Sequence, residues 1–429
     1  MLTQEENNRL TQVGPDTPAG NLLRRYWHPV AAAGELTADR PKKRLKILGE
    51  DLVLYRTESG QYGLLAEHCS HRGTSLYYGF LEGEYLRCPY HGWLYEPSGH
   101  CVEQPFEPAQ SLMKHTLRHG AHPVEELGGL LFAYMGPPEK KPLLPRWDLL
   151  AWPGATRKIT VQPILSCNWL QAEENSADVT HTFFLHGRTM IEKGRAQSTY
   201  LFAQPFARYG FQPFPWGVLK SWEYEGELGT AGWGNLLVFP TMLRQHTAPG
   251  FAGKPEQLDA TMHWRTPVDD HQTQIFQLRV SWSLEAAKGP TPEPELSYAN
   301  TWFGPDGEYH MDSFESQDGM AWETQGAIAN RGGEHLGASD RGIVMFREML
   351  SEQIDVVERG GDPIALVWND ADNEAIDLEV WLSQRGFSAL ASQDEPVRRK
   401  TREEVMDNRH EVFEVPYGAA RPHSGGQKA

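Results

Sequence analysis

Two short Cys–His pairs constrain this chain more than any other feature. The first is Cys69-Ser-His71, the second is Cys88-Pro-Tyr-His91, and sixteen residues separate them. Gly73 and Gly92 follow the pairs and allow tight turns that direct backbone N–H groups toward the sulfur atoms. The spacing therefore predicts two ligand-bearing loops that meet around one metal site.

Two thiolates and two imidazoles in this order predict a [2Fe–2S] cluster of the Rieske kind. Cys69 and Cys88 would hold one iron, and His71 and His91 would hold the other. Neutral imidazole in place of anionic thiolate raises the reduction potential above that of a four-cysteine ferredoxin. The alternative is a tetrahedral zinc site, but zinc ligands usually come as C-x2-C and H-x3-H rather than as two mixed pairs. Electron transfer is therefore the first function to expect.

Composition and charge exclude several other functions. The 429 residues suggest two or three domains, and the formal net charge of −17 argues against a nucleic-acid partner. The sequence contains no run of eighteen apolar residues, so no membrane span is expected. The first residues lack the basic and apolar pattern of a signal peptide. Cys101 and Cys167 remain after the cluster ligands and are expected to pack in the core. Without a disulfide framework, we expect a cytoplasmic protein.

The order of expected elements predicts an α+β protein with two domains. Thr3 and Glu6 form a capping box for a short helix through Leu10. Strands near 44–48, 52–56 and 63–67 would form the antiparallel scaffold of the first cluster loop. A proline-rich connector follows, so we expect a Rieske domain over 1–150, including the N-terminal helix, and a catalytic domain over 151–429 with a polar C-terminal tail. Strands at 262–266 and 274–282 would supply the antiparallel sheet of the second domain.

A second group of possible metal ligands lies beyond the connector. In a helix, Glu174, Asp178 and His181 would share one face, but His186 would not. Both histidines could reach one metal only if the helix ended near Leu185, with Gly187 just past its end. Two histidines and a carboxylate are the ligands of non-haem Fe(II) oxygenases. Two capping histidines are the alternative, which the upstream cluster motif makes less favourable.

The two motifs together, C-x-H-x16-C-x2-H and N-W…E-N-x-x-D-x-x-H-x4-H, resemble the oxygenase component of Rieske non-haem iron oxygenases over about 20–350. The resemblance implies a helix-grip (START-like) catalytic domain in which His181 and His186 bind a mononuclear Fe(II). It implies that Asp178 is not a ligand but connects this iron to a cluster histidine of the neighbouring subunit, in a homotrimer or in a hexamer made of two trimers. It also implies an NAD(P)H-dependent flavin/iron–sulfur reductase or a ferredoxin as electron donor. Thr74 and Tyr90 stand where respiratory Rieske proteins have a disulfide, which implies a lower-potential cluster.

The third iron ligand is expected much later in the chain. The segment 316–340 resembles the phthalate 4,5-dioxygenase branch, and the match implies that Asp318 is this ligand. Sequence reasoning alone leaves Asp312, Glu315 and Glu323 as alternatives. Ser339-Asp340 then begins a helix with apolar residues at helical spacing, which Gly360-Gly361 ends.

The resemblance also limits the substrate, since this branch oxidises aromatic acids. We expect O-demethylation or monooxygenation of a lignin-derived methoxylated aromatic acid, with cis-dihydroxylation as the alternative. A Rieske electron carrier without oxygenase activity is the alternative of another class, but it would need only the first third of the chain. Arg244 is the candidate for binding a substrate carboxylate, Arg208 is a second choice, and an ordinary surface arginine is the alternative. Phe183 and Phe184 would line an apolar pocket or pack in the core.

Overall fold

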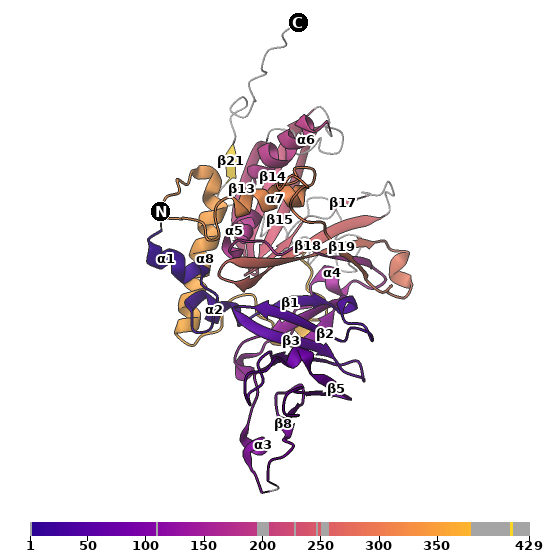
Figure 1. Ribbon diagram of the computed structural model, residues 1–429. Helices are drawn as coiled ribbons and strands as arrows, with labels where there is room; N and C mark the ends of the chain where they lie inside the picture. The colour runs from indigo at the N-terminus through magenta and orange to yellow at the C-terminus, as the bar shows by residue number, and fades with distance from the viewer. Residues whose placement is uncertain are drawn as a thin grey trace.

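The computed structural model describes residues 2–108, 110–194, 206–226, 229–245, 248–249, 257–378 and 412–414. Figure 1 shows two regions, a β-rich one at the lower end and a large sheet with helices above it. The prediction of an α+β fold is confirmed. The polar C-terminal tail lies outside the described residues. No helix in the described parts is long and apolar enough to cross a membrane.

The lower region contains three small antiparallel sheets. Their strand orders are β1 (Trp27–Ala32), β11 (Leu130–Tyr134), β10 (Val124–Leu127); β2 (Lys42–Ile47), β3 (Glu50–Arg56), β4 (Tyr62–Ala66), β9 (Ala121–His122); and β5 (Phe80–Glu82), β6 (Tyr85–Arg87), β7 (Leu94–Tyr95), β8 (Cys101–Glu103). The three strands predicted before the first cluster loop are β2, β3 and β4. The last of these sheets lies at the tip of the molecule, beside α3 (Met113–Thr116).

The upper region is built on a ten-stranded sheet, antiparallel except where β12 and β20 pair in parallel. Its order is β20 (Glu295–Tyr298), β12 (Thr156–Val161), β19 (Gln272–Trp282), β18 (Leu258–Asp269), β16 (Met242–Arg244), β15 (Gly229–Val238), β14 (Gly217–Gly226), β13 (Phe206–Phe214) and β21 (Val412–Glu414), with β17 (Ala248–Pro249) paired to β18. The strands predicted at 262–266 and 274–282 are parts of β18 and β19. The boundary predicted at 150 falls in the connector between β11 and β12, which contains α4 (Asp148–Ala151).

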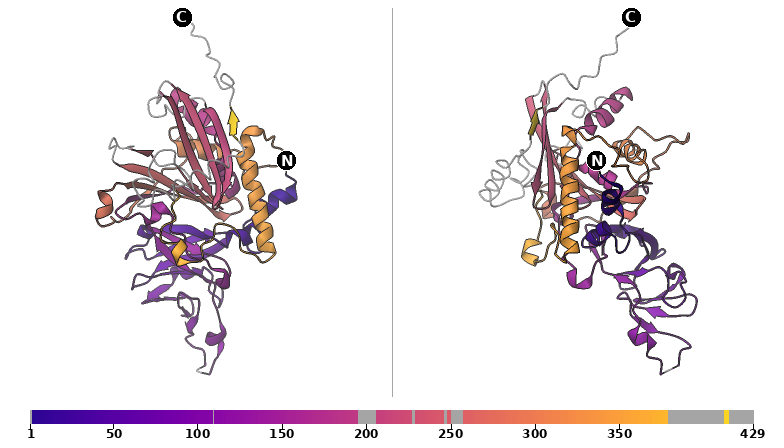
Figure 2. Two further views of the ribbon diagram at one scale, coloured as in Figure 1. Left: turned by 180° about the vertical axis from the view of Figure 1, so that it is seen from behind. Right: turned by 90° about the vertical axis from the view of Figure 1, so that its left-hand side faces the viewer.

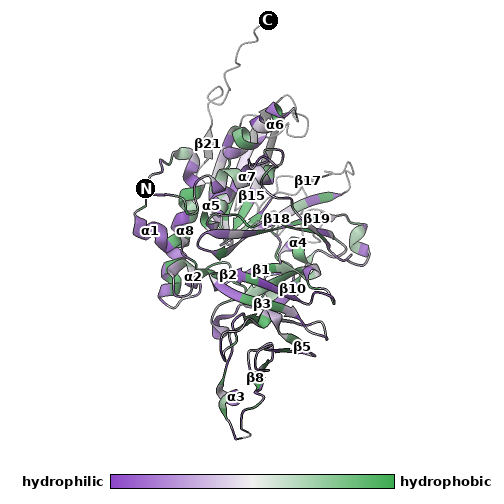
Figure 3. Cartoon of the chain, in the orientation of Figure 1, coloured by the Kyte–Doolittle hydropathy of each residue, from purple (hydrophilic) through white to green (hydrophobic). Residues whose placement is uncertain are grey.

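The helices of the upper region are short, except for one. They are α5 (Trp169–Glu174), α6 (Thr189–Glu192), α7 (Phe314–Glu323) and α8 (Arg341–Glu358), with 3-10 or π turns at η4 (Asn175–Ala177), η5 (Thr182–Arg188), η7 (Ala286–Lys288), η8 (Ala338–Asp340) and η9 (Asp370–Asp372). The 3-10 turns η1 (Ala33–Glu35) and η2 (Leu76–Tyr78) belong to the lower region, and η3 (Pro138–Lys140) lies in the connector. The long helix α8 begins and ends where the sequence predicts, and Gly360 after it has φ +80°. It carries both hydrophobic and hydrophilic residues, and Phe346, Leu350 and Ile354 form its buried face (Figure 3).

The N-terminal helices α1 (Gln4–Thr11) and α2 (Pro18–Leu23) lie beside α8 in both views (Figures 1 and 2). The predicted capping box of α1 is present, because Glu6 N donates to Thr3 Oγ1 at 3.2 Å and Thr3 N donates to Glu6 Oε2 at 2.7 Å. Arg9 then pairs with Glu358 at 2.8 Å. The start of the chain, predicted as part of the Rieske domain, therefore packs on a helix of the catalytic region.

Candidate metal centres

Both cluster loops have the same backbone geometry. Cys69 N donates to Thr74 O at 2.9 Å and Gly73 N to Cys69 O at 2.8 Å, and the second loop repeats this pattern with Cys88 N to Trp93 O at 2.8 Å and Gly92 N to Cys88 O at 3.1 Å. Gly73 and Gly92 both have φ +74°, a conformation that a side chain would strain. The two pairs are therefore presented by two matched tight turns.

The four predicted cluster ligands lie together. Cys69 and Cys88 are each 3% exposed, and the rings of His71 and His91 have centroids 4.5 Å apart. His71 Nδ1 is buried without a hydrogen-bond partner, which is costly for a polar atom. A metal–nitrogen bond would remove this cost, so these residues fit an iron–sulfur cluster.

Aromatic residues and one buried histidine surround the loops. Tyr95 Oη lies 3.2 Å from Cys69 Sγ, and Trp93 stacks on the ring of His71 at 4.5 Å. His119 Nε2 lies 2.8 Å from Ala66 O and its Nδ1 lies 2.7 Å from Ser70 Oγ, between the first two ligands. Burial lowers the pKa of His119, which favours the neutral ring that this arrangement requires. Hydrogen bonds of His119 therefore connect Ser70 in the first ligand loop to the backbone of Ala66.

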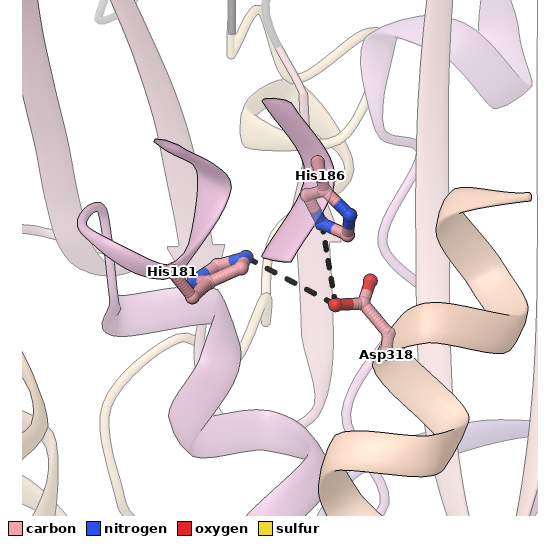
Figure 4. Close-up of side chains that lie close together, drawn as sticks. All are labelled: His181, His186 and Asp318. Carbon is pink, nitrogen blue, oxygen red and sulfur yellow. Dashed lines mark ion pairs between the residues drawn. The ribbon is translucent and has the colours of Figure 1, made fainter. Parts of the chain in front are cut away.

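The second candidate centre consists of His181, His186 and Asp318. Asp318 Oδ1 lies 3.3 Å from His186 Nε2 and 4.0 Å from His181 Nε2, and the candidate ligand atoms lie within 4.8 Å of one another. In Figure 4 both rings point toward the carboxylate, which comes from α7. This is the two-histidine, one-carboxylate donor set of non-haem iron sites, so the residues fit Fe(II).

The predicted helix geometry around the histidines is wrong. Helix α5 ends at Glu174, Asp178 is extended, and the chain then forms a π-helical turn over Thr182–Arg188, so Gly187 lies inside a helix. A π-helix has i→i+5 hydrogen bonds, so residues five apart return to nearly the same side. This wider turn, not a helix end, brings His181 and His186 together.

Each histidine has an acceptor behind it that fixes which nitrogen faces the metal position. Asp178 Oδ2 lies 3.1 Å from His181 Nδ1, and Gln317 Oε1 lies 2.8 Å from His186 Nδ1. Gln317 is fully buried and its amide donates to Met311 O at 2.9 Å. A proton on Nδ1 of each ring would suit these two oxygens and would leave Nε2 as the ligand atom.

Asn175 is a further polar residue at the centre. Its Nδ2 lies 3.3 Å from His181 Nε2 and 3.5 Å from Asp318 Oδ1. Sequence reasoning missed both Asn175 and Gln317. Each stands inside a recognised motif, but a role for an amide depends on neighbours that only the fold supplies.

Buried ionisable side chains lie beside this centre. Lys220 donates to Asp178 O at 2.6 Å, and burial lowers its pKa to about 8. Burial raises the pKa of Glu173 to about 8, although Arg265 lies 3.8 Å away. Glu174, which was predicted to share a face with His181, instead binds Arg331 at 2.8 Å and Arg347 at 2.6 Å.

The alternative carboxylates do not join His181 and His186 in the described residues. Asp312 is exposed and lies 3.5 Å from Lys193. Glu323 accepts from Tyr309 Oη at 2.7 Å, and Glu315 accepts from Gln277. The cluster with both histidines contains Asp318.

The structure does not support the substrate role predicted for Arg244. Arg244 is fully buried on β16, and its Nη2 pairs with Asp148 Oδ2 at 3.1 Å. The alternative of a surface arginine is wrong as well. Arg208 is exposed on β13. Phe183 is buried, Phe184 is 53% exposed, and their rings lie 4.9 Å apart.

Comparison with known proteins agrees with these two centres. Residues 26–117 match the Rieske [2Fe-2S] domain, and residues 305–410 match the LigXa C-terminal domain like family. The chain is 35% identical to the 5,5'-dehydrodivanillate O-demethylase oxygenase subunit of Sphingobium sp. over 88% of this chain and 86% of that protein. The chain is a Rieske oxygenase. It is also 36% identical to the phenoxybenzoate dioxygenase subunit alpha of Ectopseudomonas oleovorans, over 85% of this chain and 88% of the relative.

A solved structure shares the fold of this Rieske oxygenase. Pseudomonas putida CBB5 NdmA aligns with a TM-score of 0.58 at 20% identity, over 80% of this chain and 94% of its own. The identity of this chain to the oxygenase subunits named above shows that it is an oxygenase subunit, an oxidoreductase that uses O2 and electrons from a separate component. Its Rieske domain carries a [2Fe–2S] cluster, and the oxygenases of this family carry a mononuclear iron. A zinc protein and a simple electron carrier are thereby excluded.

Proposed function

We propose that this oxygenase subunit removes a methyl group from a methoxylated aromatic acid. Identity of 35% over 88% of the chain to a dehydrodivanillate O-demethylase subunit carries this proposal. The reaction would convert the methyl ether, O2, two electrons and two protons into a phenol, formaldehyde and water. The electrons would come from an NAD(P)H-dependent flavin/iron–sulfur reductase or a ferredoxin, in the cytoplasm.

The protein's own residues have distinct roles in this proposal. Cys69, Cys88, His71 and His91 would hold the cluster, and His181, His186 and Asp318 would hold the mononuclear iron. When bound, the two groups supply one-electron transfer and dioxygen activation, respectively. Asp178 and Gln317 keep the two histidines in the tautomer and orientation that metal binding requires.

We also propose that the working form is a homotrimer, alone or paired into a hexamer. The cluster loops lie in the lower region of Figure 1, whereas the helices of the second centre lie in the upper region, on one face of the large sheet (Figures 1 and 2). The Asp178 side chain keeps 20% exposure beside His181, so it remains accessible to a histidine of a neighbouring subunit. Light scattering on the purified holoenzyme tests the oligomer, and a monomer with full turnover would contradict it.

Cis-dihydroxylation is the second candidate, because the chain is also 29% identical to the phthalate 4,5-dioxygenase oxygenase subunit of Pseudomonas putida over 85% of its length. A panel of phthalate, substituted benzoates and methoxylated mono- and biaryl acids distinguishes the two. The holoenzyme is supplied with a reductase and the products are identified by mass spectrometry. Loss of CH2 with release of formaldehyde supports demethylation, whereas gain of two oxygens and two hydrogens supports dihydroxylation.

A further inference from the structure

Three polar residues that neither metal centre uses form a cluster between the large sheet and α7. His263 on β18 and Gln277 on β19 are directly opposite in the antiparallel register. Gln277 Nε2 lies 3.1 Å from His263 Nε2 and 3.4 Å from Glu315 Oε1 on α7. Cross-strand partners lie on the same face of a sheet, so both strand residues face the helix.

This cluster lies next to the candidate iron ligands. Glu315 precedes Asp318 by three residues in α7, so the two carboxylates lie on neighbouring positions of one helix face. The ring of Phe314, between Ser313 and Glu315, lies 4.8 Å from that of His186. Arg265, two residues after His263 on the same strand, lies 5.9 Å from the ring of Trp322 on α7. These contacts place the His263 face of β18 under α7, on the side of the metal ligands.

The hydrogen bonds leave one donor and one acceptor open in the cluster. Burial lowers the pKa of His263 to about 3, so the ring is neutral at physiological pH. Because the Gln277 amide donates to Nε2, the ring proton is on Nδ1. Among the described residues, His263 Nδ1 and Glu315 Oε2 have no hydrogen-bond partner. The cluster therefore suits a ligand group that both accepts and donates one hydrogen bond.

We infer that His263, Gln277 and Glu315 recognise a phenolic hydroxyl group of the substrate beside the iron position. The hydroxyl would donate to the Glu315 carboxylate and accept from His263 Nδ1–H. A methyl ether has no proton to donate, and a substrate carboxylate would be repelled by Glu315. The inference rests on the proposed function and narrows its substrate class to aromatic acids with both a hydroxyl and a methoxy group.

Binding measurements test this inference independently of turnover. Isothermal titration of iron-loaded, oxygen-free holoenzyme would compare 4-hydroxy-3-methoxybenzoate with 3,4-dimethoxybenzoate, which carries a methoxy group in place of the 4-hydroxyl group. A hydrogen bond to a charged group predicts at least about tenfold tighter binding of the hydroxylated acid. In Glu315→Met this preference should fall to within about threefold, while the affinity for the dimethoxy acid stays nearly the same.

Two further variants serve as controls for a change in folding or metal content. Glu315→Gln keeps the shape but loses the charge, so it should bind both acids with a reduced preference. Glu308→Gln changes an exposed carboxylate earlier in the chain and should keep the full preference of the wild type. Iron and cluster content are measured for every variant.

The outcomes separate this inference from the proposed function. If wild-type protein binds both acids equally and demethylates them, hydroxyl recognition is wrong and the proposed function stands. If it binds the hydroxylated acid more tightly but Glu315→Gln and Glu315→Met keep the preference, other residues recognise the hydroxyl group and the inference is wrong. If no methoxylated acid binds or is demethylated, the proposed function fails, and the inference fails with it.

Discussion

The two candidate metal centres are built in opposite ways. All four cluster ligands come from two loops within residues 69–91, and each loop is closed by its own backbone hydrogen bonds. At the second centre, His181 and His186 come from a π-helical segment and Asp318 comes from α7. Gln317, which orients His186, is 131 residues away from it in the chain. The first centre is thus a local structure, whereas the second depends on the docking of distant elements.

The surroundings of the two centres differ as well. Cys69 and Cys88 belong to an apolar cluster with residues such as Val53, Leu65 and Leu86. The second centre has the buried ionisable groups Lys220, Glu173 and Arg265 beside it. Buried charges are stable only with well-placed partners, so this centre should respond more strongly to changes outside the ligand set.

The largest effect should come from removing one ligand of either centre. His181→Ala should lower turnover by at least about a thousandfold, because the metal that activates O2 is lost. Iron analysis should show loss of the mononuclear iron while the visible spectrum of the cluster persists. Cys69→Ala should give the reverse, with no cluster spectrum and mononuclear iron retained. Loss of both metals in either variant would contradict the separation of a local and a distant centre.

Asp178→Asn should have the next largest effect, since it removes a charge without removing a ligand. The amide oxygen can still accept from His181 Nδ1, so both metals should remain. Electron transfer from the cluster should slow by about 100-fold, the upper range for residues behind metal ligands. Stopped-flow oxidation of the reduced cluster measures this rate. Unchanged kinetics would show that Asp178 does not connect the two centres.

The sequence predicted the local cluster centre better than the centre that is built from distant elements. The cluster loops, their strands β2 to β4 and the helix cap at Thr3 depend on neighbours a few residues away, and all were recognised. The continuous helix through Asp178 was wrong, because side-chain spacing alone does not distinguish an α-helix from an interrupted helix with a π turn. The burial of Arg244 could not be predicted, because its partner, Asp148, is 96 residues away. The ligand roles of His181, His186 and Asp318 stay predictions, although the fold brings these residues together.

Gln317→Leu tests how strongly the second centre depends on its distant support. The variant keeps all three ligands but removes the amide oxygen that lies 2.8 Å from His186 Nδ1, so the ring is held less firmly in one orientation. Iron affinity should fall by about tenfold, measured by competition with a chelator. Gln325→Leu, which changes an exposed residue after α7, is the matched control. If Gln317→Leu bound iron as tightly as the wild type, Gln317 would have no role in iron binding.

The smallest effect should come from Tyr95→Phe, which changes the local centre by one hydroxyl group. Tyr95 Oη lies 3.2 Å from Cys69 Sγ and can donate a hydrogen bond to it. Such a bond stabilises the reduced cluster, which carries more negative charge, so its loss should lower the reduction potential. Redox titration measures the shift, and Tyr85→Phe, at an exposed position on β6, should leave the potential unchanged. Because both loops close through their own backbone, Tyr95→Phe should keep its cluster and its mononuclear iron. A variant that lost the cluster would show that this centre, too, depends on side chains outside its loops.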